Sequence, residues 1–456
     1  MRPSRLFVAA FALSAMLLSS VSPAQTVRDL HSFTSNGNSQ YPYLVTPAQG
    51  RDGELFGTTI SQNYGSIFRL LTTGKEADLF EFDDTDGYNP YGGVTLGTDG
   101  NFYGTTVGGG SAGYGVLFKI TPGGTFTVLH EFSGGSDGEY PSAAPIEGLD
   151  GNLYGTTESG AGLLGATAYS YTPSGTFTTI YQFENTTNEY GIPAPLIQGF
   201  DGNLYGTGYY GTNNCGSIFE ITTSGTLLMQ YNFDCTGGSN PAGPLVLASD
   251  GNFYGTTYTG TGEVRGSVFK MSPQGTVTTV HTFRTGSEGQ LPVGGLVQAT
   301  DGNLYGSTKF GGNQDYGTLY QITTRGAYTQ LYSFPASIGE YPTGSLLQHT
   351  DGLLYGTAEF GGANGYGSVY SLDMGLGPFI TFVRSTGGVG QTAQILGQGL
   401  TGTTAVSFNG IAATSFKVAS DTFLTAVVPS GATTGPVVVT TPGGTLTSNK
   451  NFRIIQ

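Results

Sequence analysis

One short motif recurs along most of this chain and limits the folds that it can adopt. Asp-Gly, any residue, Leu or Phe, Tyr or Phe, and then Gly occurs seven times, at a mean spacing of about 50 residues. Tandem copying of a unit of this length indicates a repeat architecture. The copies begin at Asp52, Asp99, Asp150, Asp201, Asp250, Asp301 and Asp351.

Each copy contains short runs rich in Thr, Tyr, Phe and Val, separated by Asp-Gly and Ser-Gly turns. In the third copy the expected strands are an apolar stretch ending at Leu149, then 152–157, a segment near 168–171, and 177–183. Consecutive hairpins with four strands in roughly 40 to 50 residues are typical of β-propeller blades. The 77 glycines also favour an all-β chain, because each Gly inside a helix costs roughly 1 kcal/mol relative to Ala.

The two ends of the repeat region predict a closed ring. The fourth strands end in a shared three-residue pattern: His, Tyr or Phe comes first, any residue second, and Phe third. The first such pattern, at 31–33, precedes any complete copy. The seventh copy has a third strand at 367–372 but no fourth strand after it. We therefore expect the strand at 26–33 to complete the last blade, which leaves only short, protected edges. The prediction is an all-β, seven-bladed β-propeller over residues 25–375, closed by the N-terminal strand.

The N-terminus has the pattern of a secretory signal peptide. Arg2 and Arg5 precede an apolar run that ends in Ser22-Pro23-Ala24, which predicts a signal peptide over residues 1–24, cleavage after Ala24, and a secreted or periplasmic protein. A membrane anchor is the alternative, but the run is shorter than the roughly 20 apolar residues that a span needs. Cleavage removes two arginines and takes the formal charge from −15 to −17. Such a charge disfavours binding to nucleic acid or to anionic membranes.

The repeats resemble the GloVer-type tandem repeats of bacterial secreted proteins, over roughly residues 26–375. The whole unit recurs, and the resemblance implies a propeller-like extracellular protein without implying an agreed activity.

After residues 376–378 the repeat stops and a second pattern begins. Six or seven short alternating strands between Gly turns favour an immunoglobulin-like β-sandwich over residues 378–456. The runs Gly397-Gln-Gly-Leu400 and Val406-Ser-Phe-Asn-Gly410, with the Val-Pro-Ser-Gly run that follows, are similar to an IPT/TIG domain. That resemblance implies a spacer, adhesion or docking unit. DNA binding, which some such domains perform, is not expected here because the segment has so few cations: Arg384, Lys417, Lys450 and Arg453.

Both cysteines lie in the fourth copy, Cys215 at the start of its third strand and Cys235 after its fourth strand. In a hairpin that turns near residue 224, these positions face each other within disulfide reach. Export favours oxidation, so we expect a Cys215–Cys235 disulfide, with two free thiols as the alternative.

The histidines and the acidic turns do not have the pattern of a metal site. His31, His130 and His281 occupy a slot that Tyr fills in other copies, so they are expected on separate blades. Asp recurs in the Asp-Gly turns because its side chain bonds its own backbone. The densest acidic cluster, 83–86, lacks the ligand spacing of a calcium loop, although calcium there stays an alternative. We expect no metal and no cofactor.

Binding residues are expected where the copies disagree. The residue at the end of the second strand and its successor lie at the mouth of a loop on one propeller face, and they vary from copy to copy. Carboxylates, a lysine and aromatic rings on one rim could stack on and hydrogen-bond a sugar or a peptide; random drift of loop tips is the alternative. The candidate ligand rim is Glu158, Tyr209, Tyr210, Tyr258, Lys309, Phe310, Glu359 and Phe360.

These observations favour a secreted, non-catalytic binding or scaffold protein. We expect a monomer without a membrane span that presents the rim to an extracellular glycan or protein ligand. One alternative is a polysaccharide-active enzyme, a glycoside hydrolase or lyase, with Glu158 or Glu359 as acid or base. Those residues lie on the third and seventh copies, across the ring, whereas paired catalytic carboxylates lie roughly 5–10 Å apart. A purely structural cell-envelope component is the other alternative. The sequence contains no nucleophile elbow and no phosphate loop, and no catalytic residue is assigned.

Overall fold

The computed structural model describes residues 25–35, 39–61, 64–160, 164–184, 194–211 and 213–455. The expected signal peptide at 1–24 and its cleavage position lie outside these residues. Within them the backbone consists of strands, turns and loops. The described residues therefore contain no helix that is long and apolar enough to cross a membrane.

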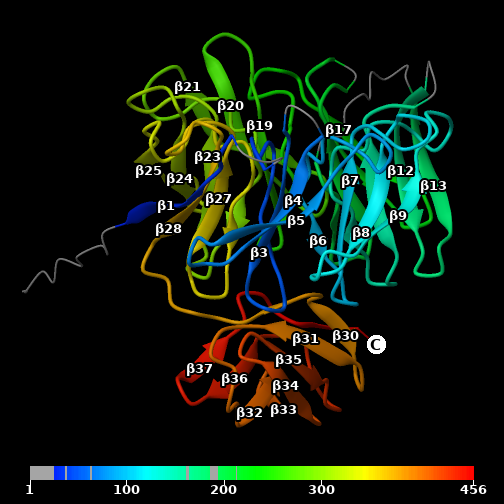
Figure 1. The fold of residues 1–456 in the computed structure, drawn as a ribbon, viewed down its shortest axis with the longest axis vertical. Coiled ribbons are helices and arrows are strands. Elements are labelled where there is room, and N and C mark those ends of the chain that lie inside the picture. The colour runs from blue at the N-terminus through cyan, green and yellow to red at the C-terminus, as the bar shows by residue number, and fades with distance from the viewer. Residues whose placement is uncertain are drawn as a thin grey trace, which may run out of the picture.

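Seven four-stranded antiparallel sheets make up the repeat region, and each spans one copy of the unit (Figure 1). The inner strands have two residues each: β2 Ala48–Gln49, β6 Thr95–Leu96, β10 Ile146–Glu147, β14 Ile197–Gln198, β18 Val246–Leu247, β22 Val297–Gln298 and β26 Leu347–Gln348. The second strands are β3 Leu55–Thr59, β7 Phe102–Thr106, β11 Leu153–Thr157, β15 Leu204–Gly208, β19 Phe253–Thr257, β23 Leu304–Thr308 and β27 Leu354–Ala358.

The third and fourth strands of the sheets have five to eight residues. The third strands are β4 Ser66–Leu70, β8 Val116–Ile120, β12 Leu164–Tyr171, β16 Ser217–Ile221, β20 Val264–Met271, β24 Thr318–Ile322 and β28 Ser368–Asp373. The fourth strands are β5 Glu76–Glu81, β9 Phe126–Glu131, β13 Phe177–Glu184, β17 Leu227–Asn232, β21 Val277–Arg284 and β25 Tyr328–Ser333. The expected strand near 168–171 thus begins earlier, at residue 164.

The glycine of the repeated motif is required by the packing of the next strand. In the first sheet Gly57 lies opposite Phe68 in the β3–β4 register, and a Cβ at Gly57 would lie 2.5 Å from Cζ of Phe68. The corresponding glycine faces Phe or Tyr of the third strand in each of the other sheets. Any larger residue would push this buried ring out of the core.

The Asp and Tyr of the motif hold the turn between the first two strands. In the third copy Asp150 accepts the N–H of Asn152 (3.1 Å) and the hydroxyl proton of Tyr154 (2.6 Å). The same tyrosine–aspartate hydrogen bond forms in the copies that begin at residues 99, 201, 250, 301 and 351. The first copy has Phe56 instead, and there Asp52 pairs with Arg69.

The N-terminal strand completes the last sheet, as expected. Strand β1, Thr26–Ser32, pairs antiparallel with β28, and Thr26 lies opposite Asp373. A second contact joins the same two ends of the repeat region, because Gln49 donates to Oγ1 of Thr350 (2.7 Å) and accepts the Thr350 N–H (3.1 Å). The equivalent contact, from a Glu or Gln of one sheet to a backbone N–H of the sheet before it, recurs at four other junctions: Thr98–Glu147, Leu149–Gln198, Ser249–Gln298 and Thr300–Gln348.

The C-terminal segment forms two further four-stranded sheets and one small parallel pair. The first sheet contains β29 Thr381–Phe382, β31 Thr392–Leu396, β35 Phe423–Val427 and β34 Phe416–Ser420. The second contains β33 Ile411–Ala412, β32 Ala405–Phe408, β36 Val437–Thr441 and β37 Gly444–Thr447. The pair is β30 Thr386–Gly388 and β38 Arg453–Ile455. One apolar core draws on both sheets, with Ile395 and Leu424 from the first and Val406 and Val439 from the second.

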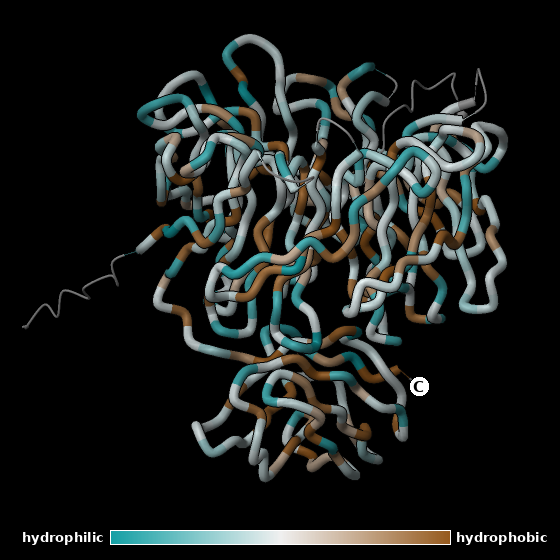
Figure 2. Tube along the Cα trace, in the orientation of Figure 1, coloured by the Kyte–Doolittle hydropathy of each residue, from teal (hydrophilic) through white to brown (hydrophobic). Residues whose placement is uncertain are grey.

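The sequence predicted six or seven strands in this segment, and the described residues form ten, β29 to β38. Strands β29, β30 and β33 have only two or three residues each. Gly399 lies between β31 and β32, where its amide N–H donates to Asp421. In the tube view apolar residues follow the strands and polar residues gather in the loops (Figure 2).

The C-terminal sheets lie against the ends of the repeat sheets that carry the Asp-Gly turns (Figure 1). The Arg51 guanidinium donates to the Thr98 carbonyl (2.6 Å) and to Gln394 (2.7 Å), and it lies 4.7 Å from the centre of the Phe423 ring. The Thr422 hydroxyl donates to the Arg51 carbonyl (2.7 Å). The loops with variable residues therefore lie on the opposite face, away from the C-terminal segment.

Candidate functional site

Five rim residues lie one position beyond the end of a second strand, namely Glu158, Tyr209, Tyr258, Lys309 and Glu359. The other three, Tyr210, Phe310 and Phe360, lie one position further along. For Glu158, Tyr258 and Lys309, the backbone N–H donates to a carbonyl of the same copy, that of the residue before the Pro at the entry to the inner strand. Glu158 bonds Tyr140 (3.2 Å), Tyr258 bonds Asn240 (3.0 Å), and Lys309 bonds Leu291 (3.0 Å). The rim side chains therefore vary on a backbone that is the same from copy to copy.

The acceptors of these bonds have an unusual backbone conformation. Tyr140, Asn240, Leu291 and Tyr341 have φ between 56° and 59°. This left-handed region is uncommon for bulky residues and costs of the order of 1–3 kcal/mol. The conformation occurs at the same position in several copies, directly before the Pro that leads into the inner strand. We therefore attribute it to the shared backbone path of that segment.

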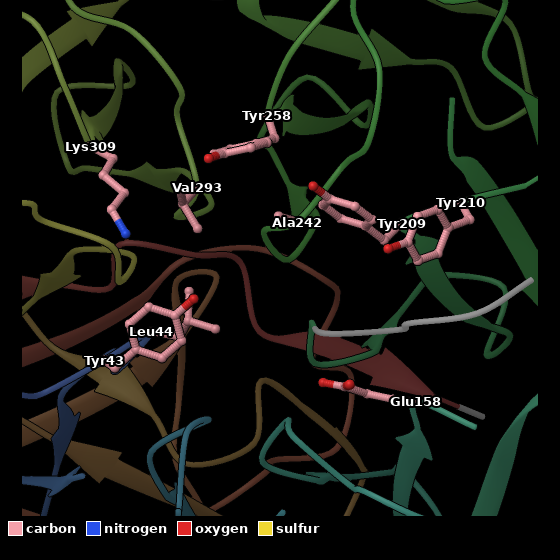
Figure 3. Close-up of a pocket in the computed structure, with 9 residues that line it drawn as sticks. All are labelled: Tyr43, Leu44, Glu158, Tyr209, Tyr210, Ala242, Tyr258, Val293 and Lys309. Atoms are coloured by element: carbon pink, nitrogen blue, oxygen red, sulfur yellow. The ribbon is translucent and has the colours of Figure 1, made fainter. Parts of the chain in front are cut away.

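The rim and the segments that lead into the inner strands together form a pocket of about 310 Å³ (Figure 3). Five of the eight expected rim residues line it, namely Glu158, Tyr209, Tyr210, Tyr258 and Lys309. The other lining residues are Tyr43, Leu44, Ala242 and Val293. The pocket thus gathers side chains from sheets that are far apart in the sequence.

Phe310, Glu359 and Phe360 lie beside this pocket without lining it. Phe310 packs against Tyr341, with ring centres 5.0 Å apart, and Phe360 packs against Tyr41 at 5.2 Å. Glu359 accepts a salt bridge from Lys309 at 3.3 Å. These three residues therefore support the wall that carries Lys309.

The electrostatics of the pocket depend on burial and on two carboxylates. Burial raises the pKa of Glu158, and the Ser142 side chain acts in the opposite direction. Burial also raises the pKa of Glu359, against the opposing charge and hydrogen bond of Lys309. Burial, and then the charge of Glu359 and the nearby tyrosines and Glu158, raise the pKa of Tyr43 to about 12.

Glu158 and Glu359 act on the same two tyrosines. After burial, both carboxylates contribute to the raised pKa of Tyr91 as well as to that of Tyr43. Tyr43 and Tyr91 contact each other edge to face, with ring centres 5.3 Å apart. The sheets that carry the two carboxylates are not neighbours in the chain, but the charges of both carboxylates act on the same pair of tyrosines.

Aromatic rings make up one side of the pocket. The Tyr209 and Tyr258 ring centres are 6.4 Å apart, and Tyr210 packs edge to face on Tyr209 at 5.0 Å. Tyr210 is 41% exposed, which leaves much of its surface available to a ligand.

Four lining residues were not expected from the sequence: Tyr43, Leu44, Ala242 and Val293. All except Leu44 directly follow the Pro at the entry to an inner strand. The position after it varies among the described copies: Tyr43, Tyr91, Ser142, Ala194, Ala242, Val293 and Thr343. The disagreement between copies that singled out the rim could therefore have identified this second ring of positions.

The other sequence candidates have structural roles. Cys215 and Cys235 form a disulfide, with Cα atoms 5.3 Å apart. In the acidic cluster, Asp83 accepts the backbone N–H of Thr85 and Asp86 accepts that of Asp83, which closes a turn. His130 pairs with Asp137 of the following loop at 3.1 Å. Within the described ranges, no group of three or more His, Cys, Asp or Glu side chains could hold a metal ion.

A comparison with models of protein families identifies the family of this chain. The model of the Gloeobacter/Verrucomicrobia repeat matches residues 17–163, 135–300 and 266–451, which together span most of the sequence. This chain belongs to the Gloeobacter/Verrucomicrobia repeat family. The third match extends into the C-terminal segment. A comparison with curated proteins gave no match.

Three solved structures are similar to this member of the Gloeobacter/Verrucomicrobia repeat family. The extracellular domain of a protein assigned as a hybrid two-component system of B. thetaiotaomicron has 12% identity and a TM-score of 0.49, with 94% of this chain and 57% of that chain covered. PorZ, a surface component of the type-IX secretion system of Porphyromonas gingivalis, has 14% identity, a TM-score of 0.49, and coverage of 93% and 60%. TolB from Acinetobacter baumannii has 15% identity, a TM-score of 0.39, and coverage of 62% and 64%. The chain spans less than two thirds of the length of each.

Proposed function

We propose that this protein is a secreted, non-catalytic binding or scaffold protein that takes an extracellular ligand in the pocket lined by Glu158, Tyr209, Tyr258 and Lys309. The observation that carries the proposal is the convergence of variable side chains in one pocket on a repeated backbone frame. Loops held by a rigid scaffold are the usual place for binding residues. Drift of loop tips alone gives no reason for these residues to meet.

The architecture that we propose is a seven-bladed propeller over 25–375, followed by an immunoglobulin-like sandwich of the IPT/TIG type over 378–456. The seven four-stranded sheets support the first part, and the β1–β28 pairing with the Gln49–Thr350 contact supports closure of the ring. The single core shared by the two C-terminal sheets supports the second. In this arrangement the sandwich is a spacer or docking unit on the face opposite the pocket.

Two further observations support an exported protein. The Cys215–Cys235 disulfide is a bond that persists in oxidising compartments. The basic, apolar and small-residue pattern of residues 1–24 is that of a cleaved leader. We therefore propose that the mature protein lies outside the cytoplasm, secreted or periplasmic.

A ligand screen tests the binding role. The mature protein, residues 25–456, is applied to a glycan array and a peptide library, and hits are measured in solution. A Tyr209→Ala/Tyr258→Ala double variant is expected to lose at least about tenfold in affinity, because stacking partners of this size contribute on the order of 1 kcal/mol each. Tyr64→Ala, at an exposed residue outside the pocket lining, is the matched control. Hits that bind the double variant as well as the wild type would place the ligand elsewhere.

A polysaccharide-active enzyme is the second candidate because the charges of Glu158 and Glu359 both contribute to the raised pKa of Tyr43 and of Tyr91. A buried carboxyl with a raised pKa is suited to act as a general acid beside an ionised one. The test is release of reducing ends or unsaturated products from polysaccharides, compared among the wild type, Glu158→Gln and Glu359→Gln. Turnover that both substitutions abolish would replace the binding role, whereas binding without turnover supports it.

A further inference from the structure

Lys309 shows how this face holds an ammonium group. Its Nζ lies 3.3 Å from Glu359 and 5.7 and 5.9 Å from the ring centres of Tyr43 and Tyr341. The Lys309 side chain is only 21% exposed and that of Glu359 only 12%. A carboxylate and aromatic rings together stabilise a cation by Coulomb attraction and by cation–π contact, more strongly where water is excluded.

Glu158 lies beside tyrosine rings in the pocket, as Lys309 does, but it has no cationic partner among the described residues. Its carboxylate points into the pocket, on the side away from Lys309 (Figure 3). Among the described residues no Lys, Arg or His forms a salt bridge with it. A partly buried carboxylate without a counter-charge is unfavourable, and a cation that enters the pocket would relieve that cost.

The groups around Glu158 accept hydrogen bonds or make apolar contact. The Tyr43, Tyr209 and Tyr258 hydroxyls turn toward the space that the pocket encloses (Figure 3). A hydroxyl oxygen accepts from an N–H, and an ammonium group has three donors and no acceptor. Leu44 and Val293 supply apolar surface in the same pocket, which suits the methylene stem of a long cationic side chain.

We propose that this pocket binds a lysine side chain of a partner polypeptide, with Glu158 as counter-ion and Tyr43 and Tyr258 as hydroxyl and ring partners. The inference rests on the binding role proposed above and names its ligand. Lysine is favoured over other cations because Lys309, in the same pocket, already places an ammonium group beside a carboxylate and tyrosine rings. The formal charge of the chain, −15 before leader removal, favours encounter with a basic partner.

The test uses the mature protein and two peptides that differ only in charge. The probes are acetyl-Gly-Lys-Gly-amide and the same peptide acetylated on the lysine Nζ, titrated calorimetrically at pH 7 and low salt. The lysine peptide is expected to bind at least about tenfold more tightly than its acetylated form, and Glu158→Gln is expected to remove about tenfold of that affinity. Glu263→Gln, at an exposed residue in the loop after β19, changes the net charge equally and should leave the affinity within about twofold.

Three results would overturn the inference. They are equal affinity for the two peptides, unchanged affinity in Glu158→Gln, and no binding of the lysine peptide at millimolar concentration. Glucosamine oligomers and their N-acetylated forms serve as a further arm, and binding of the amino sugar without the lysine peptide would also refute it. A neutral ligand that depends on Tyr258 would refute the lysine preference but keep the binding role, whereas a screen without any Tyr209- and Tyr258-dependent ligand would refute both.

Discussion

One position in the third strand of each sheet, the one that faces the motif glycine, is occupied by different aromatic residues in different copies. The described sheets place Phe there in four copies and Tyr in three: Tyr169, Tyr320 and Tyr370. These three side chains are fully buried, and their hydroxyls have no hydrogen-bond partner among the described residues. An unpaired buried hydroxyl costs about 1–3 kcal/mol.

Tyr320→Phe should therefore raise the free energy of unfolding by about 1 kcal/mol, because it removes the unpaired hydroxyl and keeps the ring. Tyr305 is the matched control in the same sheet, since its hydroxyl donates to Asp301 (2.8 Å) and accepts from Gln321 (2.9 Å). Tyr305→Phe should lower the free energy of unfolding by about 1 kcal/mol. Urea denaturation measures both, and a Tyr320→Phe variant as destabilised as Tyr305→Phe would contradict the expectation.

At the scale of elements, the outer hairpin of the fourth copy depends on a covalent link. Strands β16 and β17 pair from Ser217–Asn232 to Ile221–Leu227, and the disulfide lies beyond their open end. The Asn240 N–H bonds the Cys215 carbonyl (2.7 Å), and Tyr258 bonds the Asn240 carbonyl. The disulfide thus lies next to the backbone that holds one wall of the pocket.

Replacing both cysteines with serine should lower the free energy of unfolding by about 3 kcal/mol, from the chain-entropy cost of a loop of this length. The cysteines are 20 residues apart. Thermal unfolding of the variant and of the wild type, with and without reductant, measures the effect. Alkylation under non-reducing conditions is the control, and labelling of both thiols in the wild type would refute the bridge.

For the whole molecule, the proposed ring depends on contacts between the two ends of the repeat region. The β1 strand supplies the outer edge of the last sheet, and Gln49 joins the first inner strand to Thr350. Without these contacts, the third strand β28 would be an exposed edge and one inter-sheet junction would open.

Deletion of residues 25–33 should therefore abolish the single cooperative unfolding transition, because the last sheet loses its outer strand. Arg28→Ala, at an exposed residue of the same strand, keeps the backbone pairing and should leave the melting temperature within a few degrees. Differential scanning calorimetry of the wild type, the deletion variant and Arg28→Ala measures the unfolding transition of each. A deletion variant that melts like the wild type would show that the ring does not need this strand.

The tyrosine–aspartate bonds predict loss of stability at alkaline pH. Burial and the adjacent aspartate raise the pKa of Tyr103, Tyr205, Tyr254 and Tyr305 above 10. A raised folded-state pKa contributes stability that is present below pH 10 and is lost as the pH rises above it. The denaturation midpoint should therefore fall between pH 10 and 12, and less steeply when these four tyrosines are Phe. A midpoint that is independent of pH over this range would contradict the assignment.

Much of the fold could be predicted from local chemistry. The Asp-Gly turns, the strand pattern and the half-unit at each end predicted the sheets, the β1–β28 pairing and the disulfide, because each depends on residues within one or two copies or on a count of strands. Short strands such as β29, β30 and β37 escaped prediction. A strand of two to four residues has too little periodicity to recognise, and its pairing is decided by neighbouring strands.

The sequence by itself determined that one four-stranded unit is copied, that its glycines and aromatic residues have fixed packing roles, and which few positions are free to vary. Only the tertiary structure decided which of those positions meet. Tyr43, Glu158 and Lys309 line one pocket, although they come from the first, third and sixth copies. The physical reason is that curvature and closure of the sheets bring their inner ends together, and no local pattern in the sequence specifies which side chains then face one another.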